Sequence, residues 1–105
     1  MKRIRRQWGF LRLLLEDAQQ NHRRDVLRHA NADQINAVSE LVMNTLKKRV
    51  PVTPDVVARL KKHKRVLREV AKRSHSVKKR RALLLGQKGR GLWQALGRVC
   101  RCLTR

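Results

Sequence analysis

Basic side chains are concentrated in one part of this sequence. Twelve lysines and arginines, against a single acid, Glu69, lie in the 23 residues from Arg59 to Arg81. Lysine offers a point charge and arginine can bind two phosphate oxygens at once, so this composition favours the phosphate backbone of a nucleic acid. The twelve predicted nucleic-acid-binding residues are Arg59, Lys61, Lys62, Lys64, Arg65, Arg68, Lys72, Arg73, Lys78, Lys79, Arg80 and Arg81.

Recognition of base edges is not predicted for this stretch. Asn and Gln, which pair with adenine edges, are scarce there. The preceding segment RVPVTP, at 49–54, lies between two predicted helices and is longer than the usual turn of a helix-turn-helix motif. We therefore expect backbone binding with a steep salt dependence. If about six phosphates are neutralised, log K against log salt should have a slope of about −5.

Residues that could ligate a metal or catalyse a reaction are scattered. The seven acids form no pair that suggests acid–base catalysis, the six Ser and Thr lie in no nucleophile motif, and no Gly-Lys-Ser/Thr phosphate loop is present. The histidines and cysteines lack the spacing of a zinc site. We expect no enzyme activity, no metal and no cofactor. The histidines and cysteines are His22, His29, His63, His75, Cys100 and Cys102.

The whole chain carries a large excess of positive charge. Its 105 residues include 28 Lys and Arg but only seven Asp and Glu, which gives a formal net charge of +21. Such an excess repels itself in a compact state, so nucleic acid or an anionic membrane surface is the expected partner. The hydrophobic fraction of 41% predicts one small, mainly aliphatic core. We expect marginal stability until a polyanion binds.

The apolar residues recur with a helical period, and no stretch has the period of a strand. They predict helices over 3–17, 22–30 and 31–48, the third starting at a capping-box pattern formed by Asn31 and Gln34. The predicted fold class is therefore all-α, a small bundle of five or six short helices.

Proline and serine mark the helix boundaries in the second half of the chain. Thr53 is predicted to cap a helix whose first position is Pro54. This helix is predicted to run unbroken over 54–73. Ser74 or Ser76 is predicted to start the next helix.

Gly86 is predicted to end that helix, and the sequence becomes rich in glycine from this residue on. The predicted organisation is a helical basic domain over 1–85, a Gly-rich hinge over 86–91 and an amphipathic tail over 92–105.

Several motifs of the C-terminal half resemble a viral family. The stretch VPVTPDVVARLKKHKRVLREVAKRSHSVKKRRALLLGQKGRG is similar to small basic proteins of adintoviruses and related Polinton (Maverick) elements, double-stranded DNA viruses with adenovirus-like virion genes. The resemblance implies a minor core or capsid precursor protein in the virion and in the nucleus of the infected cell, with viral DNA and capsid proteins as partners. The matching positions are Val50–Thr53, Leu60, His63–Arg68, Ser76–Arg81, Leu83–Leu85 and Gln87–Gly89.

The same resemblance implies proteolytic maturation. Adenovirus-type proteases cut after a pattern in which Gln-x-Gly-x precedes Gly, which Gln87, Lys88, Gly89, Arg90 and Gly91 fit. The implied cut, between Arg90 and Gly91, lies where a protease could bind an extended chain. It would release a basic, apolar peptide able to lie on an anionic membrane. The chain departs from the family in having Arg90 where Gly is usual, and in its short, charged tail.

Three functions are therefore open, in this order. The first is a non-enzymatic virion protein that packages or tethers viral DNA through its phosphate backbone, with DNA ranked above RNA as the partner. The second is a membrane-active or capsid-lining precursor that releases its C-terminal peptide after proteolysis. The third is a cellular, organellar RNA-binding protein.

Overall fold

Helices are the only regular elements of the described structure. The computed structural model describes residues 2–17, 20–50, 52–87 and 91–103, and no strand occurs among them. This confirms the all-α class, although the helices are shorter and more numerous than the apolar pattern predicts. They are α1 Lys2–Arg6, α2 Trp8–Arg12, the π-helical turn η1 Leu13–Asp17, α3 Gln20–Arg28, α4 Ala32–Leu46, α5 Pro54–Lys61, α6 Lys64–Ala71, α7 Val77–Leu85 and α8 Gly91–Cys102.

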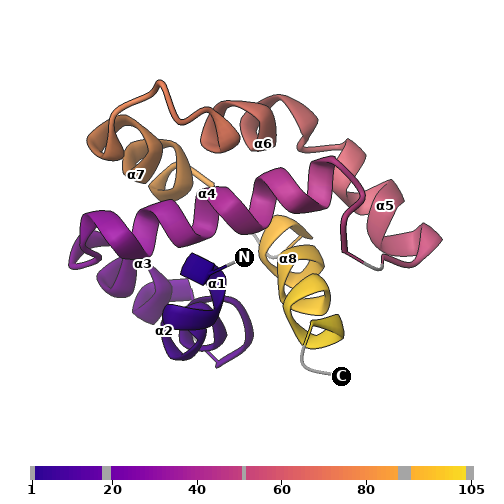
Figure 1. Cartoon of the computed structure of the whole chain (residues 1–105), viewed down its shortest axis with the longest axis horizontal. Helices are drawn as coiled ribbons and strands as arrows, with labels where there is room; N and C mark the ends of the chain where they lie inside the picture. The colour runs from indigo at the N-terminus through magenta and orange to yellow at the C-terminus, as the bar shows by residue number, and fades with distance from the viewer. Residues whose placement is uncertain (1, 18–19, 51, 88–90, 104–105) are drawn as a thin grey trace.

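Helix α4 is the centre of the arrangement. It crosses the width of the molecule, with α6 and α7 along one side and α1 and α2 along the other (Figure 1). Helix α8 packs against α5, α2 and η1. The described chain measures 32 × 29 × 27 Å. Because α4 contacts helices from both halves of the sequence, it places the basic N-terminal helix and the basic run of residues 59–81 around one shared core.

The start of α4 is set by the predicted capping box. The Asn31 side-chain oxygen accepts a hydrogen bond from the Gln34 backbone N–H at 2.9 Å. The Gln34 side-chain oxygen accepts one from the Asn31 backbone N–H, also at 2.9 Å. Two N–H groups that the helix cannot satisfy itself are thereby paired. The prediction of a capped helix starting here is confirmed.

The helix predicted over 54–73 is two helices, so that prediction is wrong. Helix α5 ends at Lys61, and His63 has backbone angles outside the helical range (φ −114°, ψ 17°) before α6 begins at Lys64. An unbroken helix of this length would measure about 30 Å, as long as the whole molecule. The break lets α5 pack against α8 while α6 packs against α4 and α7, so the apolar faces of both reach the core.

The helix predicted over 3–17 is also divided. Gln7 separates α1 from α2 with non-helical angles (φ −103°, ψ 25°), and residues 13–17 form a π-helical turn. The break at Gln7 lets α1 and α2 both lie against α4. There the Gln7 side chain donates a hydrogen bond of 2.7 Å to the Asp33 carboxylate of α4. The N-terminal basic residues are therefore held on the central helix.

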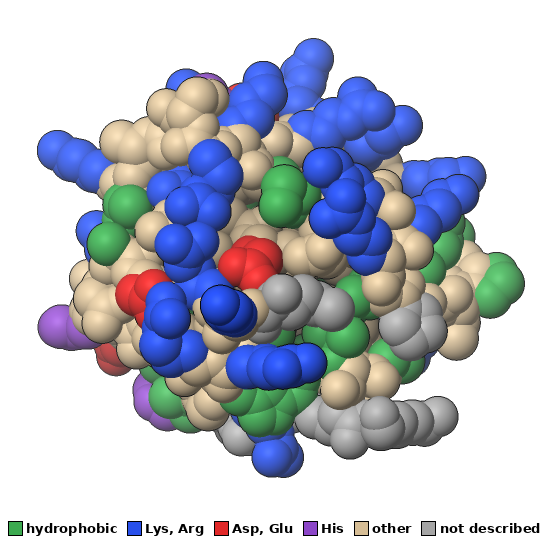
Figure 2. Space-filling model, in the orientation of Figure 1, with side chains coloured by type: hydrophobic (Ala, Val, Ile, Leu, Met, Phe, Trp, Pro, Cys, Tyr) green, Lys and Arg blue, Asp and Glu red, His purple; other side chains and the backbone are tan. Residues whose placement is uncertain are grey.

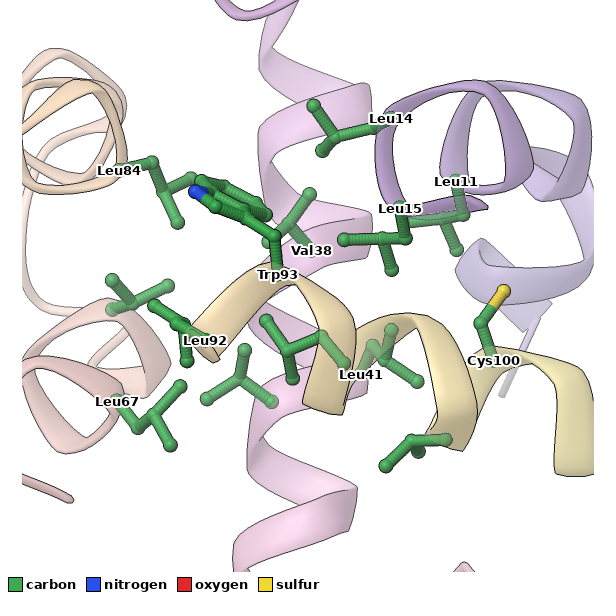
Figure 3. Packing of buried hydrophobic residues seen from close by; sticks show 14 of the residues in the cluster. Leu11, Leu14, Leu15, Val38, Leu41, Leu67, Leu84, Leu92, Trp93 and Cys100 are labelled. Atoms are coloured by element: carbon green, nitrogen blue, oxygen red, sulfur yellow. The ribbon is translucent and has the colours of Figure 1, made fainter. Parts of the chain in front are cut away.

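The core is formed by aliphatic side chains from every part of the chain around one tryptophan. Trp93 of α8 is 2% exposed, and it lies between side chains of α4, α7 and η1 in Figure 3. The Arg23 guanidinium stacks over its ring at 4.9 Å from the centroid, a cation–π contact. The labelled residues around it in Figure 3 include Leu14, Leu15, Val38, Leu41, Leu84 and Leu92.

Helix α8 belongs to this core. Its residues Leu92, Leu96, Val99 and Cys100 are 0–2% exposed. The tail predicted over 92–105 is amphipathic, but in the described structure its apolar face packs with the residues of the predicted 1–85 domain. The described residues of this tail therefore share one core with the helices that precede it.

At Gly97 the backbone of α8 lies close to that of η1. A Cβ atom at Gly97 would lie 2.6 Å from the Leu15 carbonyl oxygen, too close for either backbone to keep its place. We predict that Gly97→Ala lowers the free energy of unfolding by about 1–3 kcal/mol, the usual cost of overpacking. Urea denaturation followed by circular dichroism measures this change.

The matched control is Gly9→Ala in α2. A Cβ there meets no atom within 4 Å, so this variant should be as stable as the parent chain or slightly more stable. Equal stability of the Gly97→Ala variant and the parent would contradict the packing of α8 against η1.

Candidate nucleic-acid interface

Nine of the twelve predicted phosphate-binding residues are exposed on α5, α6, α7 and the turns between them. Figure 2 shows Lys and Arg side chains standing out from the part of the surface where α6 and α7 lie, and again where α1 lies against α4. We call the nine residues the α5–α7 basic face. They are Lys61, Lys62, Lys64, Arg65, Arg68, Lys72, Arg73, Lys78 and Lys79.

Arg80 is the clear exception to the prediction. Its side chain points into the protein at 3% exposure, and its Nη1 donates a hydrogen bond of 2.7 Å to the Ser39 hydroxyl of α4. Burial lowers the pKa of the Arg80 guanidinium from its ordinary value. A side chain so enclosed does not reach a phosphate on the surface. Arg80 is therefore corrected from a binding residue to one that joins α7 to α4.

The geometry of a helix explains this error. Successive residues turn by about 100°, so the four consecutive cations at 78–81 cannot all point outward. Val77, Arg80 and Leu84 have the three- and four-residue spacing of an inward stripe, a signal present in the sequence. Arg81, beside that stripe, is half-buried and donates to the Ala30 carbonyl oxygen. Arg59 is also only partly exposed.

Three of the described acids, Asp33, Asp55 and Glu69, are engaged within the fold. Asp33 accepts hydrogen bonds from Arg6 at 2.6 Å and from Gln7. Asp55 of α5 pairs with Arg98 of α8.

Glu69 is the single acid between Lys61 and Lys79, the first and last residues of the basic face. It pairs with His75 and with Lys72 at 3.3 Å, and these hydrogen bonds, that of His75 first, lower its pKa. The remaining cations of the α5–α7 basic face have no described carboxylate to neutralise them.

A second basic group was not predicted from the sequence. A hollow of about 500 Å³ lies between α1, α4 and the turns that follow α4 and α6, and we call it the α1–α4 hollow. Its charged lining comes from three segments, each more than 20 residues from the next along the chain, so sequence spacing gives no signal for it. Arg73 belongs both to this lining and to the α5–α7 basic face, which makes the two surfaces continuous. The charged lining residues are Lys2, Arg3, Arg6, Glu40, Arg49 and Arg73.

The turn at the end of α4 positions Arg49 in this hollow. The Lys48 N–H donates to the Thr45 carbonyl, and the Arg49 N–H donates to the Asn44 carbonyl at 2.9 Å. These two bonds form a Schellman turn, with Lys48 in the left-handed conformation (φ 56°) that glycine usually occupies. The chain reverses there, and Arg49 returns alongside α4.

The proposed cleavage site is described only at its two ends. Lys88, Gly89 and Arg90 lie outside the described residues. Gln87 is half-buried, and its backbone oxygen accepts a hydrogen bond of 3.4 Å from the buried Trp93 indole. Gly91 is the first residue of α8. An extended chain across the bond between Arg90 and Gly91 would require the first turn of α8 to unwind.

Comparisons with known proteins give no assignment. No protein-family model, curated protein or solved structure matches this chain. Among the described residues, no three His, Cys, Asp or Glu side chains lie together as a metal site would need. None of the described helices is a candidate for a membrane span. Function has to be inferred from the charged surfaces themselves.

Asp33 provides a test of how the N-terminal basic helix is held. Its pKa lies well below the ordinary range, chiefly because Arg6 and then Gln7 donate hydrogen bonds to it. A carboxyl whose pKa is lower in the folded state stabilises the fold fully above its unfolded pKa of about 3.9. That stability is lost as pH falls through the lower, folded pKa. We predict that Asp33→Asn lowers the urea midpoint of unfolding at pH 7. As the pH is lowered below about 4, the urea midpoint of this variant should decrease less than that of the parent chain.

Asp25→Asn is the control, because it removes the same charge from an exposed position on α3. It should leave the urea midpoint at pH 7 nearly unchanged. If the two variants lose the same stability, the hydrogen bonds of Asp33 do not fix α1 on α4.

Proposed function

We propose that this chain is a non-enzymatic protein that binds the phosphate backbone of nucleic acid without strong sequence preference. The observation that carries the proposal is the α5–α7 basic face. Nine Lys and Arg side chains are exposed there, and the one acid beside them, Glu69, is already paired within the fold. When Lys and Arg side chains that no carboxylate neutralises contact phosphates, they displace the counterions condensed on the nucleic acid. The release of these counterions drives backbone binding.

The side chains of the basic face support backbone contact over base recognition. No Asn or Gln occurs between Arg59 and Gly86, so the bidentate readers of adenine are absent from this stretch. Lys64, Arg65 and Arg68 lie within about one turn of α6, close enough to contact neighbouring phosphates together. This chemistry recognises the regular charge of a duplex and not its sequence.

The biological setting rests on the resemblance of residues 50–89 to adintovirus and Polinton proteins. On that basis the nucleic acid is viral DNA, the role is packaging or tethering within a virion, and capsid proteins and an adenovirus-type protease are further partners. The membrane-active alternative has less support, because the apolar side chains of α8 that would enter a bilayer are buried in the core.

A salt series of binding measurements tests the proposal. Fluorescence anisotropy with a random duplex of about 20 base pairs should give a slope of log K against log salt of about −5. Replacing Lys64, Arg65 and Arg68 by Gln should make the slope less negative by about 3, since each phosphate contact contributes about 0.9. A slope near zero for the unaltered chain would overturn the proposal.

The matched control replaces Arg5, Arg24 and Arg28, three exposed arginines of α1 and α3, by Gln. It removes the same charge and should change the slope by less than about 1. An equal loss in the two variants would place binding outside the α5–α7 basic face. Tenfold tighter binding to an RNA duplex than to DNA at equal salt would favour the organellar RNA-binding alternative over a virion role.

A further inference from the structure

The α1–α4 hollow collects positive charge from three parts of the chain. Lys2, Arg3 and Arg6 come from α1, Arg49 follows α4, and Arg73 follows α6. Against these five cations the lining contains one carboxylate, that of Glu40. The volume of about 500 Å³ lies within the range of pockets that hold small organic ligands.

The neutralisation of this charge is incomplete among the described residues. Asp33 pairs with Arg3 and Arg6, and Glu40 lies 4.0 Å from Arg3. Arg49 and Arg73 are exposed and form no ion pair with a described carboxylate. The acids therefore neutralise the side of the hollow formed by α1, while its other side stays cationic.

Arg80 adds a buried cation close to the same place. Its Nε has no hydrogen-bond partner among the described residues, and its one described partner, Ser39, is neutral. The pKa of Arg80 is lowered first by burial and then by the positive charges of Arg73 and Arg3, both of which line the hollow. The positive charges of two residues that line the hollow therefore act on the buried Arg80 guanidinium.

We infer that the α1–α4 hollow is a phosphate-binding pocket, in which a phosphate group is held chiefly by Arg49 and Arg73. An arginine guanidinium matches phosphate oxygens with two parallel N–H donors, so two lining arginines without an ion pair to a described carboxylate suit a tetrahedral oxyanion. A bound phosphate would relieve the repulsion among Arg3, Arg73 and Arg80.

This inference deepens the proposed function and rests on it for the identity of the phosphate, which is that of a nucleic acid. Because Arg73 also belongs to the α5–α7 basic face, a strand that follows this face reaches the hollow without leaving the protein surface. The pocket would hold one phosphate in a fixed place, while the basic face contacts the others diffusely. It would also join α1 to the turn after α6, so that binding stabilises the N-terminal helix.

Titration with inorganic pyrophosphate tests the pocket without nucleic acid. The full-length chain is titrated by isothermal calorimetry at constant ionic strength, with sulfate as the control anion. We expect pyrophosphate to bind at one site, at least tenfold more tightly than sulfate. Arg49→Gln/Arg73→Gln should weaken pyrophosphate binding at least tenfold, and Lys61→Gln/Lys64→Gln, with the same charge loss on the basic face, less than twofold. Equal weakening in the two variants would overturn the pocket.

Short oligonucleotides distinguish the two sources of the phosphate. A 5′-phosphorylated strand that binds tenfold more tightly than the same strand with a 5′-hydroxyl, with the difference lost in Arg49→Gln/Arg73→Gln, assigns the pocket to terminal phosphates. Equal binding of both strands, weakened by the same variant, assigns it to backbone phosphates.

If duplex binding keeps its steep salt slope but pyrophosphate does not bind, the pocket is wrong and the proposed function stands. If pyrophosphate binds in the pocket and duplexes do not bind at all, the proposed function fails, and with it the assignment of the phosphate to a nucleic acid.

Discussion

Repulsion among cations is the constraint on which the rest of this structure depends. A formal charge of +21 is carried by a molecule with a radius of gyration of 12.3 Å. The seven acids are too few to neutralise this charge. Asp33, Asp55 and Glu69 form ion pairs that link separate segments of the fold. The fold is therefore held by apolar packing around α4, with carboxylates at a few joints, while its surface keeps an excess of positive charge that favours a polyanionic partner.

The core and the charged surface compete for the same short helices. Each helix after α4 has only eight to twelve residues, so each must bury one face and expose cations on the other. Where four cations are consecutive, in α7, this division fails and Arg80 is buried. The cost of placing a guanidinium there is reduced by its hydrogen bond to Ser39 and would be reduced further by an anion in the neighbouring hollow. The packing of α7 and the proposed binding of phosphate are linked through this one residue.

The sequence predicts local structure well here, and long-range geometry poorly. The all-α class, the capping box at Asn31 and a helix start at Ser74 or Ser76 depend on residues close in sequence. All three are confirmed, and the structure places the helix start at Ser76. The break at His63 was not predicted, because it depends on α5 and α6 packing against different helices. The role of α8 was also missed, since an amphipathic stripe is the same for a core helix and for a membrane-binding tail. The α1–α4 hollow needed the positions of α1, Arg49 and Arg73 in space, which no spacing rule provides.

The central claim is that phosphate neutralisation stabilises this cationic fold. It is tested most directly by the free energy of unfolding of the full-length chain in dilute buffer, with and without an excess of random duplex. At a duplex concentration of about 100 times Kd, the free energy of unfolding should rise by about 2.7 kcal/mol. This gain should disappear as salt is raised to about 1 M, where phosphate contacts are screened. An unfolding free energy that is the same with and without duplex in dilute buffer would contradict the claim.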